Sequence, residues 1–123
     1  MQTDIDTGAL EALVGEWLPV PDVAEYLGVG VSQVRGLIRS GQVIALRVGE
    51  PPVLRIPAAF LQDGALIRKL TGTLSLLRDQ SFSDAEAVRW LFTPDDSLPG
   101  TPVQALRDNR GTEVRRRAQA LGF

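Results

Sequence analysis

The first apolar positions of the chain recur at the spacing of a helix. Leu10, Leu13 and Trp17 lie on one side of a predicted short helix over residues 9–17. Two prolines then interrupt the pattern, and the second of them suits the first turn of a new helix over residues 21–27. The chain therefore begins with two short helices separated by a proline-rich break.

A third helix is predicted over residues 31–40, after a glycine-containing turn in which Gly28 is expected to be a left-handed helix cap. Its apolar positions fall at i, i+3, i+6 and i+7, which makes one stripe: Val31, Val34, Leu37 and Ile38. Its polar face carries small or hydrogen-bonding residues and two cations: Ser32, Gln33, Arg35, Gly36 and Arg39. This helix is amphipathic, with its cations opposite the buried stripe.

The pattern changes to a period of two after this helix. Residues 42–48 and 53–57 both read as strands, and the proline-containing loop 49–52 joins them as a hairpin. A short helical turn over 58–61 is expected to follow. Helix, glycine turn, helix and two-stranded ribbon is the element order of a winged helix-turn-helix.

The second half of the chain reads as helical. Ser83 and Glu86 form a capping-box pair at the start of one of its helices. The predicted helices cover residues 65–79, 83–92, 102–106 and 110–121. The predicted fold class is mainly α with a small β-hairpin, a winged helix-turn-helix followed by a C-terminal helical bundle. The predicted division of the chain is an acidic flexible tail at 1–8, a winged helix-turn-helix domain at 9–61, and a C-terminal helical domain at 62–123.

Composition removes several classes of function. The 123 residues include no cysteine and no histidine, so disulfides, thiol nucleophiles, histidine bases and Cys/His zinc sites are all excluded. The sequence points to no cofactor, to no metal site and to no enzyme. No apolar run approaches the roughly 18 residues of a membrane span, and no signal peptide is evident, which leads us to expect a cytoplasmic protein.

The net charge of −2 is unevenly distributed. Residues 1–19 carry four acidic and no basic residues, whereas residues 20–60 and 61–123 each have an excess of one positive charge. We therefore expect any affinity for nucleic acid to be moderate and strongly dependent on salt.

The residues on the open face of the third helix and on the ribbon are those that can contact DNA. Arginine bonds the guanine edge bidentately or binds a phosphate, and glycine permits a close approach to the duplex. The predicted DNA-binding residues are Ser32, Gln33, Arg35, Gly36, Arg39, Arg47 and Arg55. The alternative is a purely structural helix-turn-helix with solvated arginines, and Glu50 at the ribbon tip opposes deep insertion into a groove.

The segment VPDVAEYLGVGVSQVRGLIRSGQVIALRVG, followed by VLRIPAAFL, resembles the excisionase and MerR-like winged helix-turn-helix module over about residues 18–61. The sequence departs from that pattern at three positions. Gly30 replaces the usual serine helix cap, Val31 an often basic residue, and Gly36 a larger polar one. The resemblance implies a double-stranded DNA partner with fewer contacts than is usual in the family.

The segment AVRWLFTPDDSLPGTPVQALRDNRGTEVRRRAQAL is similar to the C-terminal domain of Xre/MbcA/ParS-type antitoxins, which binds proteins. Both segments together resemble a group of small actinobacterial DNA-binding proteins whose mycobacterial members are substrates of serine/threonine kinases. This resemblance implies a DNA-binding transcriptional regulator. Thr7 is the better phosphorylation candidate and Thr3 the second, because acidic residues precede Thr7 and Gly8 follows it. The alternative is an antitoxin-like module that binds a toxin, a partner protein or a second copy through its C-terminal helices.

Three further sets of residues are candidates for a catalytic or binding role. Asp95 and Asp96 could be a carboxylate pair, but they lie in a proline-rich turn without a neighbouring base and read as turn residues. Trp90 is expected to belong to the core. The arginines at 115–117 either contact phosphate or complement the dipole of the last helix, and we favour the second interpretation.

Overall fold

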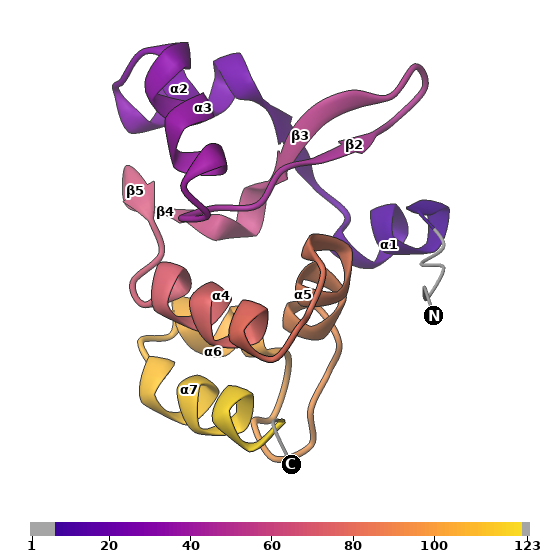
Figure 1. Cartoon of the computed structure of the whole chain (residues 1–123), viewed down its shortest axis with the longest axis vertical. Helices are drawn as coiled ribbons and strands as arrows, with labels where there is room; N and C mark the ends of the chain where they lie inside the picture. The colour runs from indigo at the N-terminus through magenta and orange to yellow at the C-terminus, as the bar shows by residue number, and fades with distance from the viewer. Residues whose placement is uncertain (1–6, 122–123) are drawn as a thin grey trace.

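The computed structural model describes residues 7–121. Seven α-helices and two small antiparallel sheets make up this part of the chain, which confirms a mainly α fold with a small β component. Figure 1 shows the helix-turn-helix and the hairpin at one end of the molecule and the C-terminal helices α4, α6 and α7 at the other. The helices are α1 (Thr7–Val14), α2 (Val20–Leu27), α3 (Val31–Arg39), α4 (Leu70–Asp79), α5 (Asp84–Leu91), α6 (Pro102–Arg107) and α7 (Gly111–Ala120).

The predicted hairpin, which is the wing of the winged helix-turn-helix, is part of a three-stranded sheet and is not isolated. Its strands are β1 (Trp17–Pro19), β2 (Leu46–Val48) and β3 (Val53–Pro57), and β3 lies between the other two. The prediction of a helix through Trp17 is therefore wrong. Gly15, at a φ of 85°, ends α1 early, and the extended residues after it pair with β3. The first hairpin strand is also shorter than predicted, although residues 43–45 before it are buried.

A second correction concerns the start of α4, which the sequence placed at residue 65. Ala65–Leu66 instead forms strand β5, which pairs with β4 (Leu61–Gln62) directly after a 3-10 turn, η1 (Ala58–Phe60). The two residues between β4 and β5 have positive φ, 54° at Asp63 and 79° at Gly64, which closes this small hairpin. The helical spacing of the leucines is real, but it begins at Leu70.

The remaining helices start where their sequence signals predict. Ser83 Oγ accepts from the Glu86 N–H at 3.1 Å and Glu86 Oε1 accepts from the Ser83 N–H at 2.8 Å, which confirms the capping box of α5. These bonds hold the pKa of Glu86 below its usual value. Thr101 Oγ1 caps α6 by accepting from the Gln104 N–H at 3.1 Å.

One continuous core joins the two halves of the chain. Val34 of α3 and Ile56 of β3 are fully buried, and so are Leu74 of α4 and Val114 of α7. The rings of Phe60 and Phe92 meet between the halves, with their centroids 5.8 Å apart. Because the core is shared, the two halves pack against each other, chiefly through α1 against α5 and η1 against α6.

Candidate nucleic-acid interface

The turn between α2 and α3 is built by a glycine in the left-handed conformation. Gly28 has φ 71° and ψ 33°, and its N–H donates to the carbonyls of Ala24 and Glu25. The Val29 N–H also donates to the Ala24 carbonyl, at 3.0 Å. These bonds satisfy the last carbonyls of α2 and confirm the predicted cap.

Gly30 caps the start of α3, as the sequence predicted, although it has no side chain with which to accept a hydrogen bond. Its own N–H donates to Oε1 of Gln33 at 3.0 Å. Gln33 is thus one half of a capping box, which occupies its carbonyl oxygen and leaves its amide nitrogen available. The spacing of three residues between Gly30 and Gln33 indicates this capping interaction, but the sequence analysis predicted Gln33 only as a DNA contact.

The two faces of α3 are separated as expected, with one exception. Val34 is fully buried and Leu37 and Ile38 are half-buried against the core, whereas Arg35 is exposed. The exception is Val31, which was placed on the buried stripe but is 39% exposed. It lies in the first turn of the helix, and the covered part of the stripe begins one turn later, at Val34.

Arg35 and Arg39 are exposed and have no hydrogen-bond or ion-pair partner within residues 7–121. No carboxylate of the described residues therefore sequesters the two guanidinium groups. Gly36 lies between them on the helix, and a Cβ added there would meet nothing within 4 Å. The fold itself does not need a glycine at this position.

The two arginines of the wing differ in their surroundings. Arg47 pairs with Leu54 and Arg55 with Leu46, so the antiparallel register places the two arginines on opposite faces of the ribbon. Arg47 is exposed. Arg55 is half-buried, donates from Nη1 to the Val48 carbonyl at 3.3 Å, and has its guanidinium close against Gly49. Arg55 thus supports the turn of the wing, while Arg47 is free for a ligand.

A residue that the sequence reading missed also fixes the wing. The carboxylate of Glu11, on α1, accepts a hydrogen bond from the Gly49 N–H at 2.6 Å. Gly49 has φ 95° and begins the turn between β2 and β3. The two residues are 38 positions apart, and no local pattern could have paired them.

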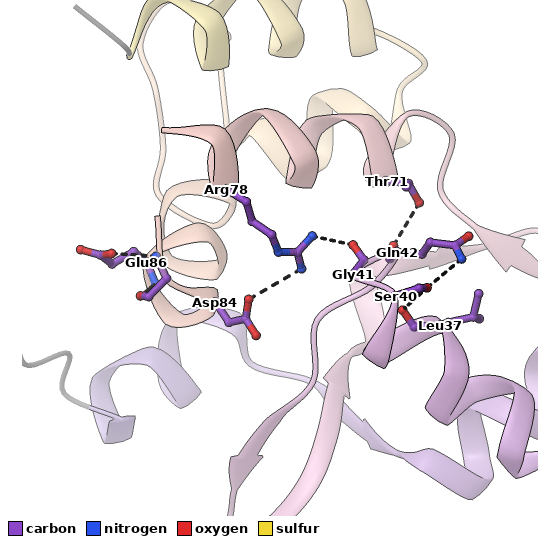
Figure 2. A network of polar contacts seen from close by, with 9 residues as sticks. Leu37, Ser40, Gly41, Gln42, Thr71, Arg78, Asp84 and Glu86 are labelled. Carbon is purple, nitrogen blue, oxygen red and sulfur yellow. Dashed lines mark hydrogen bonds and ion pairs between the residues drawn. The ribbon is translucent and has the colours of Figure 1, made fainter. Parts of the chain in front are cut away.

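The end of α3 is fastened to the C-terminal domain by a polar network (Figure 2). Arg78 of α4 donates from Nη1 to the Gly41 carbonyl at 2.6 Å and pairs with Asp84 of α5 at 3.6 Å. Thr71 Oγ1 donates to the Gln42 carbonyl at 3.0 Å. These contacts were also missed, because Arg78 and Gly41 are 37 residues apart. They hold the end of α3 at a fixed position relative to α4.

The carboxylate pair behaves as turn residues. Asp95 Oδ1 accepts from the N–H and the hydroxyl of Ser97 at 2.8 and 2.6 Å, and these two bonds lower the pKa of Asp95. Ser97 is in turn held by Arg117, whose Nε donates to its Oγ at 2.7 Å. Within residues 7–121, no three acidic side chains converge in a way that could hold a metal ion. Trp90 is half-buried against the core.

The phosphorylation candidates lie at the edge of the described chain. Thr7 is the first residue of α1, and Thr3 lies outside the described residues together with the rest of segment 1–6.

The basic residues of α7 differ in their surroundings, since Arg115 and Arg116 are exposed while Arg117 is half-buried and bonded to Ser97. Across the described part of the chain, none of the helices is long and apolar enough to span a bilayer.

The fold and this exposed helix define a winged helix-turn-helix protein. Residues 5–61 match the family described as "DNA-binding protein Rv2175c, wHTH domain", and residues 67–122 match the "Rv2175c C-terminal domain of unknown function". DNA-binding protein Rv2175c of Mycobacterium tuberculosis is 40% identical over 117 residues, which cover 85% of this chain and 79% of that protein. The NMR structure of Rv2175c has a TM-score of 0.79 at 37% identity, covering 88% of this chain and 82% of that one. The chain therefore belongs to the Rv2175c family of DNA-binding proteins.

Proposed function

We propose that this protein is a transcriptional regulator that reads duplex DNA with α3 in the major groove and with the wing on the flanking backbone. The observation that carries the proposal is the pair of exposed guanidinium groups, Arg35 and Arg39, on a helix whose opposite face is buried. Unpaired arginines in this position match the chemistry of guanine edges and phosphates.

Each side chain of the interface has a distinct role in this proposal. Arg35, in the middle of α3, bonds a guanine edge, and the amide nitrogen of Gln33 and the hydroxyl of Ser32 reach neighbouring base edges or phosphates. The exposed Val31 supplies an apolar contact for a thymine methyl group. Gly36 lets the helix backbone approach the duplex closely.

The outer contacts are to phosphate. Arg39 at the end of α3 and Arg47 on the open face of the wing bind the backbone, and Arg55 acts mainly by shaping the wing that presents Arg47. Glu50 is exposed at the tip of the wing and keeps the tip away from phosphate. Because these contacts are to phosphate, binding is expected to weaken as salt is raised, with a slope that grows with the number of contacts.

The experiment is a selection of bound sequences from random duplex DNA, followed by titration of the selected duplex. The parent is expected to enrich a defined sequence, and Arg35→Ala is expected to lose that preference at a cost of about 1–3 kcal/mol of binding free energy. Arg89→Ala on α5 is the matched control, because it removes another exposed arginine from a different helix. Equal, weak binding of every duplex by all three proteins would refute the proposal.

Phosphorylation of Thr7, with Thr3 as the second candidate, is proposed as the control of this binding by a serine/threonine kinase. A phosphate on Thr7 would stand at the start of α1, the helix whose Glu11 fixes the wing. It would add negative charge near the DNA-binding surface and weaken binding. Phosphopeptide mapping after kinase treatment tests the site, and full DNA affinity of Thr7→Glu would argue against the switch.

A homodimer through the C-terminal helices would place two copies of α3 on two half-sites.

A further inference from the structure

A polar cleft of about 440 Å³ lies where the end of α3 meets α4. The recognition helix contributes Arg39 to its lining, and α4 contributes Thr71, Ser75 and Arg78. One carboxylate, Asp79, also lines it. The cleft is therefore shared between the winged helix-turn-helix and the C-terminal domain, and it adjoins the last exposed cation of the recognition helix.

The groups in this cleft differ in how far they are already occupied. Arg78 is committed to the Gly41 carbonyl and to Asp84, so its charge is largely balanced within the fold. Arg39 and the hydroxyl of Ser75 are exposed and have no partner within the described chain. The cleft thus presents one unpaired guanidinium and one unpaired hydroxyl, the two kinds of donor that contact phosphate oxygens in protein–DNA complexes. Beside them it presents the carboxylate of Asp79, which also has no partner within the described chain.

A second cation of the C-terminal domain, unpaired within the described residues, reaches α4 next to one of the residues that line this cleft. Gly72 follows Thr71 on α4, and a Cβ added at Gly72 would lie 4.0 Å from Nη1 of Arg115 on α7. The guanidinium of the exposed Arg115 therefore reaches the surface of α4 at this glycine. Arg39 and Arg115 come from different domains, and α4 lies between the helices that carry them (Figure 1).

We propose that this cleft binds a backbone phosphate of the same duplex that receives α3, with Arg39 and Ser75 as direct contacts and Arg115 as a second cation beside them. The proposal rests on the proposed function, and it gives the C-terminal domain a share of the DNA interface. The end of a recognition helix lies close to the strand that borders the groove. In this arrangement the hydrogen bond from Arg78 to the Gly41 carbonyl fixes the spacing between the base contacts on α3 and the phosphate contacts on α4.

The test is a gain of function, which unfolding of the variant cannot mimic. Ser75→Arg should bind the selected duplex about fivefold more tightly at low salt, and its plot of log affinity against log salt should be steeper by about 0.9, as for one added phosphate contact. Gln104→Arg is the matched control. It is an exposed position on α6 with an aspartate four residues later, as Ser75 has Asp79. Equal affinities and slopes for the two variants would overturn the proposal.

The corresponding loss is tested with Arg115→Ala against Arg89→Ala. Arg115→Ala should make the salt slope shallower by about 0.9 and leave the selected sequence unchanged, because a phosphate contact carries no base preference. Arg89→Ala should match the parent. If the parent selects a sequence but Ser75→Arg and Arg115→Ala behave like their controls, this inference alone fails. If the parent selects no sequence, the proposed function fails first.

A free phosphate compound is the other source of the same chemistry. In a titration of the parent with inorganic phosphate at constant ionic strength, the amide signals of Thr71 and Ser75 should not show saturable binding, whereas the duplex should shift them. Saturable binding of inorganic phosphate with an affinity near that for DNA would assign the cleft to a small phosphate ligand and would overturn its assignment to the duplex.

Discussion

Arg35 on α3 and Arg107 on α6 are both arginines at the surface of short helices, but the chain uses them differently. Arg35 has no partner within residues 7–121, while Arg107 donates from Nη1 to the carbonyls of Ala59 and Leu61 at 2.9 and 2.6 Å. The first leaves its donors for another molecule, whereas the second connects the C-terminal domain to the end of the winged helix-turn-helix. Residue type alone does not distinguish them; the backbone carbonyls within reach do.

Two further arginines of the C-terminal domain are used by the fold in the same way as Arg107. In the C-terminal domain, Arg110 forms an ion pair with Glu113 and Arg117 is bonded to Ser97. In α3 there is no acidic residue at all, so neither of its arginines has an ion partner at helical spacing. Arginines that the fold uses are expected to affect stability when replaced, and arginines that it leaves free are expected to affect binding.

The largest expected contrast is between Arg107→Met and Arg35→Met. Arg107→Met leaves two half-buried carbonyls without their donor and should lower the free energy of unfolding by about 1–3 kcal/mol. Arg35→Met should change it by no more than about 0.5 kcal/mol, because an exposed, unbonded side chain is lost. Urea unfolding followed by circular dichroism measures both values. A stable Arg107→Met protein would break the comparison.

A smaller contrast is expected within the wing. Arg55→Met should lower the free energy of unfolding by about 0.5–1.5 kcal/mol, because the Val48 carbonyl and the turn at Gly49 lose their support. Arg47→Met should leave stability unchanged and make the salt slope of DNA binding shallower by about 0.9. Unfolding curves and salt titrations of both variants separate the two roles. Equal losses of stability at the two positions would show that the register does not divide them.

The sequence predicted those parts of this division that local patterns encode. The buried stripe of α3, the left-handed Gly28 and the capping box at Ser83 each depend on residues within one or two turns, and all are found except for the first residue of the stripe, Val31. Strand β1 was missed because Trp17 suits a helix as well as a strand, and only pairing with β3 decides between them.

The contacts that fasten the interface to the rest of the molecule could not be predicted in the same way. Glu11 reaches Gly49, Arg78 reaches Gly41, and Arg107 reaches Ala59, across 37 to 48 residues of chain. Such pairs follow from the shared core of the two halves, and no spacing in a single sequence reveals them. The free arginines of α3 were easier to predict, because exposure follows from periodicity while pairing does not.

Gly36→Ala sharpens the comparison on the binding side. The added methyl group meets nothing within 4 Å, so alanine should raise the free energy of unfolding by about 0.5–1 kcal/mol. If α3 approaches a duplex closely, the same methyl group should weaken DNA binding. Thermal unfolding and a DNA titration on one preparation test both signs. Unimpaired binding by a stabilised variant would mean that the glycine serves neither the fold nor the interface.

The smallest expected effect is a dependence of stability on pH that arises in the C-terminal domain. Hydrogen bonds from Arg110 hold the pKa of Glu113 below its ordinary value of 4.5. Hydrogen bonds from Ser97 likewise hold the pKa of Asp95 below its ordinary value of 3.8. A carboxyl group whose pKa is lower in the folded state stabilises the protein fully above its unfolded pKa, and the contribution is lost as pH falls through the folded value. The melting temperature should therefore be nearly constant from neutral pH down to the ordinary pKa of these groups. At lower pH the melting temperature should decrease.

Glu113→Gln tests the assignment of this effect. The variant lacks one titrating partner, so its melting temperature should fall less than that of the parent when pH is lowered from 7 to about 3, as followed by circular dichroism. Both groups are partly exposed, so the difference is expected to be small and to shrink in high salt. The arginines of α3 have no carboxylate partner in the described part of the chain and should add nothing to this acid dependence, so Arg35→Met should follow the parent curve. An acid-induced fall that is the same in Glu113→Gln as in the parent would show that the Arg110–Glu113 pair stabilises the fold no more than the free arginines do.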